Sequence, residues 1–186
     1  MNDRMNGFVF VPGLDYLEHH NMWRSAVNQL YDLWNADRNS APKLCRILAE
    51  SWYALSESER VNNCSKSDAA LFKKILIEVY KYGSAHFATD VDFLWLAGYM
   101  LSLFPFYFYS GEREEAFSEL KKEGTSFLFT ATQIEPDNLL FRVLYLGTQE
   151  LSDEYISAKR QLAPQLSSIF SGKSAIEEYF REVLEV

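Results

Sequence analysis

Cysteine, glycine and proline are scarce in this 186-residue chain, and their scarcity excludes several classes of protein. The two cysteines, Cys45 and Cys64, have neither a CxxC spacing nor a histidine-rich neighbourhood, so reduced thiols are expected, with Cys45 a small core residue. Glycine and proline number 8 and 5, too few for a fibrous or low-complexity chain. The chain is instead 48% hydrophobic and 16% aromatic, which supplies a core for one folded domain.

Basic side chains are in the minority, with 18 lysines and arginines against 26 aspartates and glutamates. Most of the imbalance falls after residue 93: residues 1–93 carry 10 basic and 12 acidic side chains, and residues 94–186 carry 8 and 14. An acidic C-terminal half repels phosphate backbones and anionic lipids, so we expect no direct nucleic-acid or membrane partner. The acidic C-terminal half would instead attract a basic protein partner. The alternative is that the charge only keeps a cytoplasmic protein in solution.

The longest uncharged run is short for a membrane span. Residues 93–109 carry no charge, but they number only 17, Pro105 interrupts them, and acidic residues precede them. The first seven residues lack the apolar run and small-residue cleavage site of a signal peptide. We therefore expect a buried core helix at 93–109 and a cytoplasmic protein.

Helical periodicity accounts for most of the chain, because apolar residues recur at spacings of three and four and no convincing strand alternation is present. The sequence predicts a single all-α domain over residues 1–186, with an irregular segment at 1–20 and about eight helices in an irregular array or bundle. The expected helices cover residues 25–34, 42–55, 67–82, 90–104, 112–134, 139–146, 152–162 and 174–184.

The helix that begins near Asp90 is apolar on most sides, which places it at the centre of the fold. Gly98 in its middle costs about 1 kcal/mol relative to alanine, so we expect a neighbouring helix to approach closely there. Pro105 should end or kink this helix.

Capping residues predict several helix boundaries. Ser67 should cap the helix that follows a polar loop at 56–63, and Gly83 should end that helix. Asp137 or Asn138 should cap the short helix 139–146, because Pro136 breaks the chain just before it. Ser174 with Glu177 has the spacing of a capping box for the last helix.

No arrangement of residues typical of catalysis or metal binding is present in the sequence. His19 and His20 are adjacent and His86 stands alone, so none has the spacing of a metal-binding pair. The phosphate- and nucleotide-binding motifs GxGxxG and GxxxxGK[ST] and the hydrolase motif GxSxG are missing. We therefore expect no enzyme, no metal and no cofactor.

Five carboxylates are expected to contact a partner: Asp90, Asp92, Glu112, Glu114 and Glu115. The first two stand at a helix start, where capping is the alternative explanation. The three glutamates stand in the first turn of the next helix, where they complement the helix dipole. Their position beside the aromatic run 106–109 makes them candidates for an electrostatic contact.

Two helical segments resemble a tetratricopeptide repeat, in which small residues lie where paired helices cross and a proline closes the unit. Gly98 stands 38 positions before Pro136, more than the spacing of the repeat, which implies lengthened helices. The residues that carry the resemblance are Leu94, Ala97, Gly98 and Leu101 in the opening half, and Gly124, Leu128, Ala131 and Pro136 in the closing half.

The chain also resembles the small, acidic, helical immunity proteins that protect bacteria from their own contact-delivered or polymorphic toxins. The run from Trp95 to Pro105 and the later Pro136-Asp137-Asn138 carry this resemblance, together with the acidic, all-helical character. The resemblance implies an immunity protein of contact-dependent growth inhibition that covers the basic active-site surface of a cognate toxin, such as a nuclease. The alternative is a tetratricopeptide-like adaptor or chaperone that holds a peptide segment.

Overall fold

The computed structural model describes residues 8–60, 65–111, 113–149 and 152–185. These residues form helices and no strand, and eight helices have seven residues or more, which confirms the predicted all-α array. The elements are α1 Leu14–His19, α2 Trp23–Asn35, α3 Ala41–Arg60, α4 Lys66–His86, α5 Val91–Leu103, η1 Pro105–Phe108, α6 Glu114–Ile134, α7 Leu139–Leu146, α8 Asp153–Leu162, η2 Ala163–Gln165, α9 Leu166–Ile169 and α10 Ala175–Leu184.

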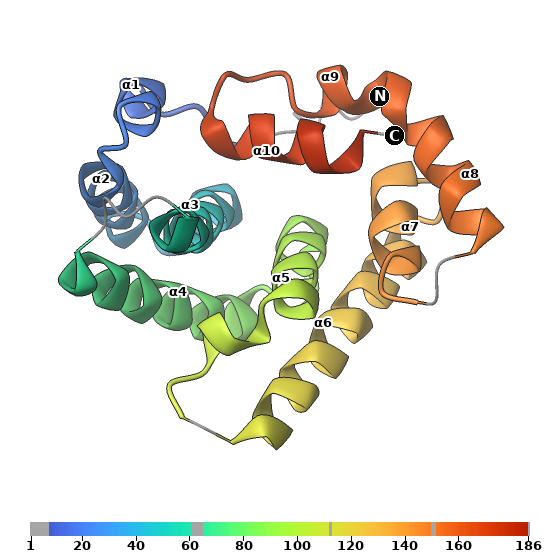
Figure 1. Cartoon of the computed structure of the whole chain (residues 1–186), viewed down its shortest axis with the longest axis horizontal. Coiled ribbons are helices and arrows are strands. Elements are labelled where there is room, and N and C mark those ends of the chain that lie inside the picture. The colour runs from blue at the N-terminus through green and yellow to red at the C-terminus, as the bar shows by residue number, and fades with distance from the viewer. Residues whose placement is uncertain (1–7, 61–64, 112, 150–151, 186) are drawn as a thin grey trace.

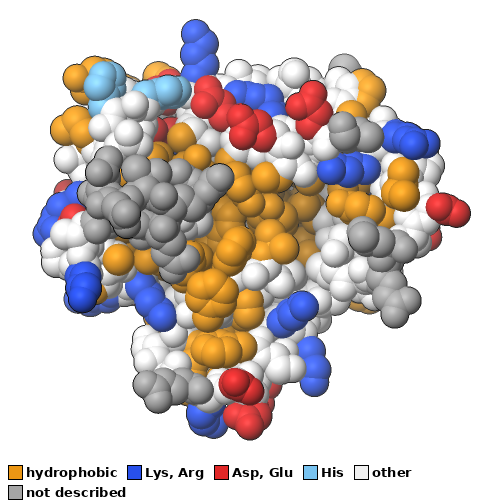
Figure 2. Space-filling model, viewed as in Figure 1, with side chains coloured by type: hydrophobic (Ala, Val, Ile, Leu, Met, Phe, Trp, Pro, Cys, Tyr) orange, Lys and Arg blue, Asp and Glu red, His pale blue; other side chains and the backbone are white. Residues whose placement is uncertain are grey.

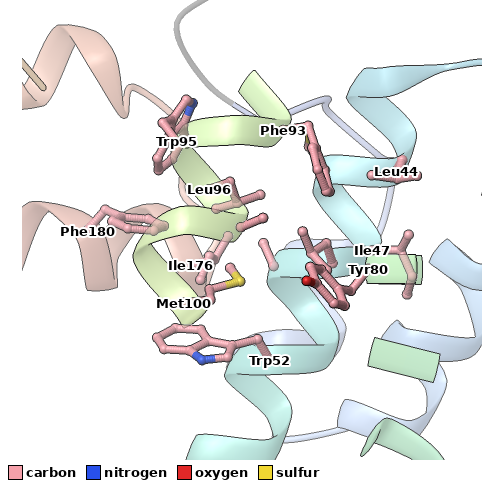
Figure 3. Close-up of a cluster of buried hydrophobic side chains, with 14 of the residues drawn as sticks. Leu44, Ile47, Trp52, Tyr80, Phe93, Trp95, Leu96, Met100, Ile176 and Phe180 are labelled. Atoms are coloured by element: carbon pink, nitrogen blue, oxygen red, sulfur yellow. The ribbon is translucent and has the colours of Figure 1, made fainter. Parts of the chain in front are cut away.

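Helix α5 lies in the middle of the molecule, with α1 to α4 on one side, α6 to α8 on the other, and α9 and α10 across the top (Figure 1). Nine of its 13 residues are buried, as its lack of a polar face predicted. Trp95 and Met100 of α5 pack beside Phe180 of α10 (Figure 3), and the Trp95 and Phe180 ring centroids are 5.4 Å apart. No helix among the described residues is long and apolar enough to cross a membrane.

Glycines sit where α5 crosses α6. A methyl group added at Gly98 would lie 2.9 Å from the carbonyl oxygen of Gly124, and one added at Gly124 would lie 2.8 Å from the carbonyl oxygen of Gly98. The two backbones therefore touch without side chains between them, which confirms the close approach predicted at Gly98. Phe93 near the start of α5 contacts Phe127 of α6, and Leu101 near the end of α5 lies against Gly124, which comes earlier in α6, so the two helices run antiparallel.

Several helix boundaries agree with the capping residues in the sequence. Asp90 Oδ1 accepts hydrogen bonds from the backbone N–H groups of Asp92 and Phe93 at the start of α5. Asn138 caps α7, which begins and ends where predicted, at Leu139 and Leu146. Ser174 caps α10 by accepting from the N–H of Glu177.

Other boundaries were predicted wrongly. Helix α3 continues to Arg60, so residues 56–60 of the predicted loop are helical, and residues 61–64 lie outside the described residues. Ser65 rather than Ser67 caps α4, and α4 continues past Gly83 to His86. Gly83 is instead a packing position, because the Phe93 ring occupies the space that a side chain there would need. Helix α1 lies within the segment 1–20 that was expected to be irregular.

A buried charge cluster joins the two ends of the chain. Arg46 of α3 pairs with Glu18 of α1, and its Nη2 lies 3.2 Å from Glu50 Oε2; all three side chains are 1% exposed or less. The other oxygen of Glu18 accepts a 2.6 Å hydrogen bond from the N–H of Ala175. Burial raises the pKa of Glu50 to about 8, although the Arg46 charge acts in the opposite direction. The cluster thus fixes the start of α10 against α1 and α3.

Candidate functional site

A pocket of about 660 Å³ lies where three helices begin. The first turns of α3, α5 and α7 form part of its wall, and the rest comes from residues 8–9, the α6–α7 connection and residues 165–170. The lining residues are Phe8, Val9, Pro42, Cys45, Asp90, Asp92, Trp95, Glu135, Asp137, Asn138, Leu139, Leu140, Phe141, Gln165, Ile169 and Phe170. This volume lies within the range of pockets that bind small ligands or single anchoring side chains of a partner.

The inner part of the pocket is apolar. Trp95, Leu140, Phe141 and Phe170 are buried, and the rings of Trp95 and Phe170 meet edge to face with centroids 6.4 Å apart. Aromatic walls of this kind bind an apolar side chain by burying its surface, at roughly 25 cal/mol per Å² removed from water. The inner pocket is therefore suited to an apolar or aromatic group.

Four carboxylates, Asp90, Asp92, Glu135 and Asp137, also line the pocket, and no lysine, arginine or histidine does so among the described residues. Asp90 is held by its capping hydrogen bonds, and Glu135 Oε2 accepts a 3.0 Å hydrogen bond from the Asn138 amide. Asp92 and Asp137 are exposed to solvent. The pocket therefore combines an apolar interior with acidic groups, an arrangement that favours a ligand with an apolar group beside a positive charge.

The thiol of Cys45 has a raised pKa, in part because the pocket is negatively charged. Its side chain is buried, and burial together with the charges of Asp90 and Asp92 raises the pKa of its thiol well above the ordinary value. The thiol therefore stays protonated at neutral pH, and a protonated thiol is a poor nucleophile. Cys45 belongs to the wall of the pocket as an apolar residue.

The structure separates the five predicted partner-binding carboxylates. Asp90 and Asp92 line the pocket. Glu114 and Glu115 are exposed in the first turn of α6, whereas the pocket meets the connection that follows the last turn of that helix. A helix of 21 residues spans about 30 Å, so the two groups cannot contact one small partner group together. Glu112 lies outside the described residues.

The sequence does not indicate Glu135 or the apolar walls as parts of a site, and it predicts Asp137 only as a possible helix cap. One signal could have placed Glu135: if the segments 90–104 and 112–134 form an antiparallel pair, the start of the first lies beside the end of the second. No local pattern places residues 8–9 or 165–170 at the same point, because their contacts arise only when α9 and α10 fold back over α5.

The histidines do not take part in the pocket. The Nδ1 atoms of His19, His20 and His86 lie 2.7, 2.8 and 2.9 Å from carbonyl oxygens four residues earlier, and all three side chains are exposed. Within the part of the chain that the structure describes, no group of three or more histidine, cysteine, aspartate or glutamate side chains could hold a metal ion. The chemistry available at the pocket is binding by apolar contact and by charge.

Comparison of the chain with protein-family models, with curated protein sequences and with solved structures found no match. A functional proposal for this chain therefore depends on the geometry of its own surface. The pocket at the start of α5 is the feature with the most defined chemistry, since shape, apolar walls and charge coincide there.

Proposed function

We propose that this protein binds and neutralises a basic toxic protein in the cytoplasm, and that the pocket at the start of α5 receives an apolar side chain from a basic segment of that toxin. The observation that supports this proposal is the combination of an aromatic interior with Asp90, Asp92, Glu135 and Asp137 and no basic lining residue among those described. In such an arrangement an apolar group provides binding energy, and neighbouring lysines or arginines provide specificity.

A nuclease is the class of toxin that this chemistry fits best. Nucleases bind phosphate backbones with lysine and arginine side chains, and an acidic inhibitor competes for the same surface. The net charge of −8 speeds the encounter with a positively charged partner and penalises acidic ones. The acidic, helical character of the chain also underlies its resemblance to immunity proteins.

The same pocket supports a second function, that of an adaptor that holds a peptide segment of another protein. A volume of about 660 Å³ is enough for one large side chain and part of its neighbours in an extended peptide. An adaptor should bind the isolated peptide, whereas an immunity protein should need the folded toxin, whose charged surface provides most of the contact.

Co-expression with any toxin domain that is encoded beside this gene tests the proposal. The wild-type protein should restore colony formation and form a stable complex with the toxin in gel filtration. The variant Asp90→Asn, Asp92→Asn, Glu135→Gln, Asp137→Asn removes four charges with little change of shape, and Asn still caps α5 at position 90. We expect this variant to fold normally but to bind at least about tenfold more weakly and to lose protection.

A matched control removes four exposed carboxylates away from the pocket: Glu114→Gln, Glu115→Gln, Glu119→Gln and Asp153→Asn. Because it has the same net charge as the pocket variant, it separates local contact from long-range attraction. Equal losses in the two variants would show that only net charge matters and would overturn the pocket as the contact. Failure of the wild-type protein to protect cells or to form a complex would refute the immunity function and favour the adaptor.

A further inference from the structure

A second surface lies at the other end of α5. Leu103 at the last position of α5, Phe106 of η1 and Val183 of α10 are 48%, 41% and 39% exposed, and the half-buried rings of Tyr99 and Tyr179 lie between these helices. Figure 2 shows hydrophobic side chains gathered in the middle of this side of the molecule, below α10. We refer to Tyr99, Leu103, Phe106, Tyr179 and Val183 as the aromatic face.

The aromatic face rests on a rigid base. Trp52 of α3 is fully buried beneath it, with ring centroids 6.1 Å from Tyr99, 5.6 Å from Phe104 and 5.4 Å from Tyr179. The hydroxyl oxygens of Tyr99 and Tyr179 are 2.7 Å apart and join α5 to α10. A surface fixed in this way loses little side-chain entropy when a partner binds.

Acidic side chains border the aromatic face along α10. Glu178 and Glu182 are four residues apart and so lie on one side of α10, and Glu185 directly follows the last residue of the helix. The basic residue among them, Arg181, donates from Nη1 to the carbonyl oxygens of Phe170 and Gly172, so its charge is directed to the backbone. Figure 2 shows acidic side chains along this edge. At the opposite edge, Lys73 Nζ donates to the carbonyl oxygen of Phe106.

We infer that the aromatic face is a second docking surface and that its occupant is an amphipathic helix of a partner, apolar towards Leu103 and Val183 and bearing lysine or arginine towards α10. Tyr99 with Leu103 on α5, and Tyr179 with Val183 on α10, have the four-residue spacing that places two side chains on the same side of a helix, so the aromatic face offers apolar side chains from two helices to the apolar side of a third. The charge of the acidic edge selects a basic occupant.

A second copy of this chain is the competing occupant, and charge disfavours it. Two copies that met through this face would bring their acidic α10 edges together, and each carries a net charge of −8. The inference does not depend on the pocket, because no residue of the aromatic face lines the pocket.

A synthetic 18-residue leucine–lysine peptide, helical and amphipathic, is the probe, and a leucine–glutamate peptide of the same pattern is its control. Fluorescence anisotropy of the labelled peptides with the full chain should show binding of the lysine peptide only. Leu103→Ser with Val183→Ser should weaken that binding about tenfold. Phe129→Ser with Ile156→Ser removes two side chains that are 47% and 44% exposed elsewhere, and it should change binding less than about twofold.

Glu182→Gln with Glu185→Gln should weaken binding of the lysine peptide in dilute buffer and have little effect at high salt, because salt screens exposed charges. Circular dichroism and urea unfolding of each variant would show whether it is folded. Absence of binding, or equal effects of the Leu103/Val183 variant and its control, would overturn the inference. A dimer detected by light scattering and abolished by Leu103→Ser, without peptide binding, would assign the face to a second copy instead.

Discussion

The two ends of α5 present different surfaces. Its amino end opens into an acidic pocket, and its carboxyl end carries the aromatic face. The difference follows from how helices start and stop. A helix start needs hydrogen-bond acceptors, so Asp90, Asp92 and Asn138 gather where α5 and α7 begin. At the other end, Pro105 stops the helix and leaves Leu103 and Phe106 exposed.

The two surfaces also differ in how they are held. The pocket is built largely from helix starts and connections, whereas the aromatic face is built on packed helices. The buried cluster of Glu18, Arg46 and Glu50 fixes α10, which carries one side of the aromatic face. The Gly98–Gly124 crossing lies between the two surfaces and holds α5 against α6. Substitutions in the cluster and at the crossing therefore test what holds the two surfaces in place, and substitutions around the pocket test partner binding.

Removal of Arg46 should have the largest effect. In the variant Arg46→Met, Glu18 loses its buried ionic partner, and we expect unfolding free energy to fall by about 3–5 kcal/mol in urea titrations. Arg24→Met is the control, because Arg24 pairs with Asp68 on the surface and its loss should cost about 1 kcal/mol or less. Similar losses for both variants would mean that the buried cluster does not hold α10.

The buried cluster should also make stability depend on pH. Because burial raises the folded-state pKa of Glu50 from 4.5 to about 8, the neutral carboxyl favours the folded state. This contribution is fully present below the unfolded-state value of 4.5 and is lost as pH rises through about 8, with little further change above it. Urea midpoints between pH 5 and 9 should therefore decrease for the wild type and decrease less for Glu50→Gln. Parallel curves would contradict this assignment.

Substitution at the Gly98–Gly124 crossing should lower the unfolding free energy less than substitution in the buried cluster. Gly98→Ala places a methyl group 2.9 Å from the Gly124 carbonyl oxygen, where backbone cannot move aside easily, so we expect a loss of about 1–3 kcal/mol despite better helix propensity. Gly147→Ala is the control, because the nearest atoms to an added methyl group are 3.4 Å away and its φ of −65° suits alanine. A raised urea midpoint for Gly98→Ala would show that α5 and α6 can separate at no cost.

Reversal of acidic charges should have the smallest effects, and the change in association rate should show which acidic groups lie nearest the contact. Asp92→Lys with Asp137→Lys at the pocket should slow association with the toxin by about tenfold at low salt. Glu114→Lys with Glu115→Lys at the far end of α6 should slow it by about twofold, because those charges act only at long range, and the addition of salt should remove this effect. Stopped-flow fluorescence measures both rates. The opposite ranking would move the contact to the start of α6.

Much of the fold was predictable because its determinants are local. Asp90, Asn138 and Ser174 cap helices as expected, and the glycine in the apolar helix marks a helix crossing. The errors came from residues with two possible roles. Gly83 can end a helix or make room for a neighbour, and the Phe93 ring decides for the second. Residues 56–60 are polar but helical, because glutamate and arginine have high helix propensity and can continue α3.

Of the candidate site, the sequence indicated Asp90 and Asp92 and an acidic C-terminal half. Arg46 and Glu50 stand one turn apart among apolar residues of α3, a pattern that hints at a buried pair but does not reveal Glu18 as the partner.

Hydrogen-bond periodicity, capping and burial of apolar faces act over a few residues, and for that reason the amino-acid sequence by itself determined most of the helices, the starts of α5, α7 and α10, and the central place of α5. The pocket and the buried cluster were decided only by tertiary structure. Their chemistry depends on groups as distant as Phe8 and Phe170, or Glu18 and Ala175, whose contacts form when separate helices pack around α5. The electrostatic field in the pocket and the pKa of a buried carboxyl both depend on that packing. Packing determines how deeply each group is buried and how far apart the charges lie.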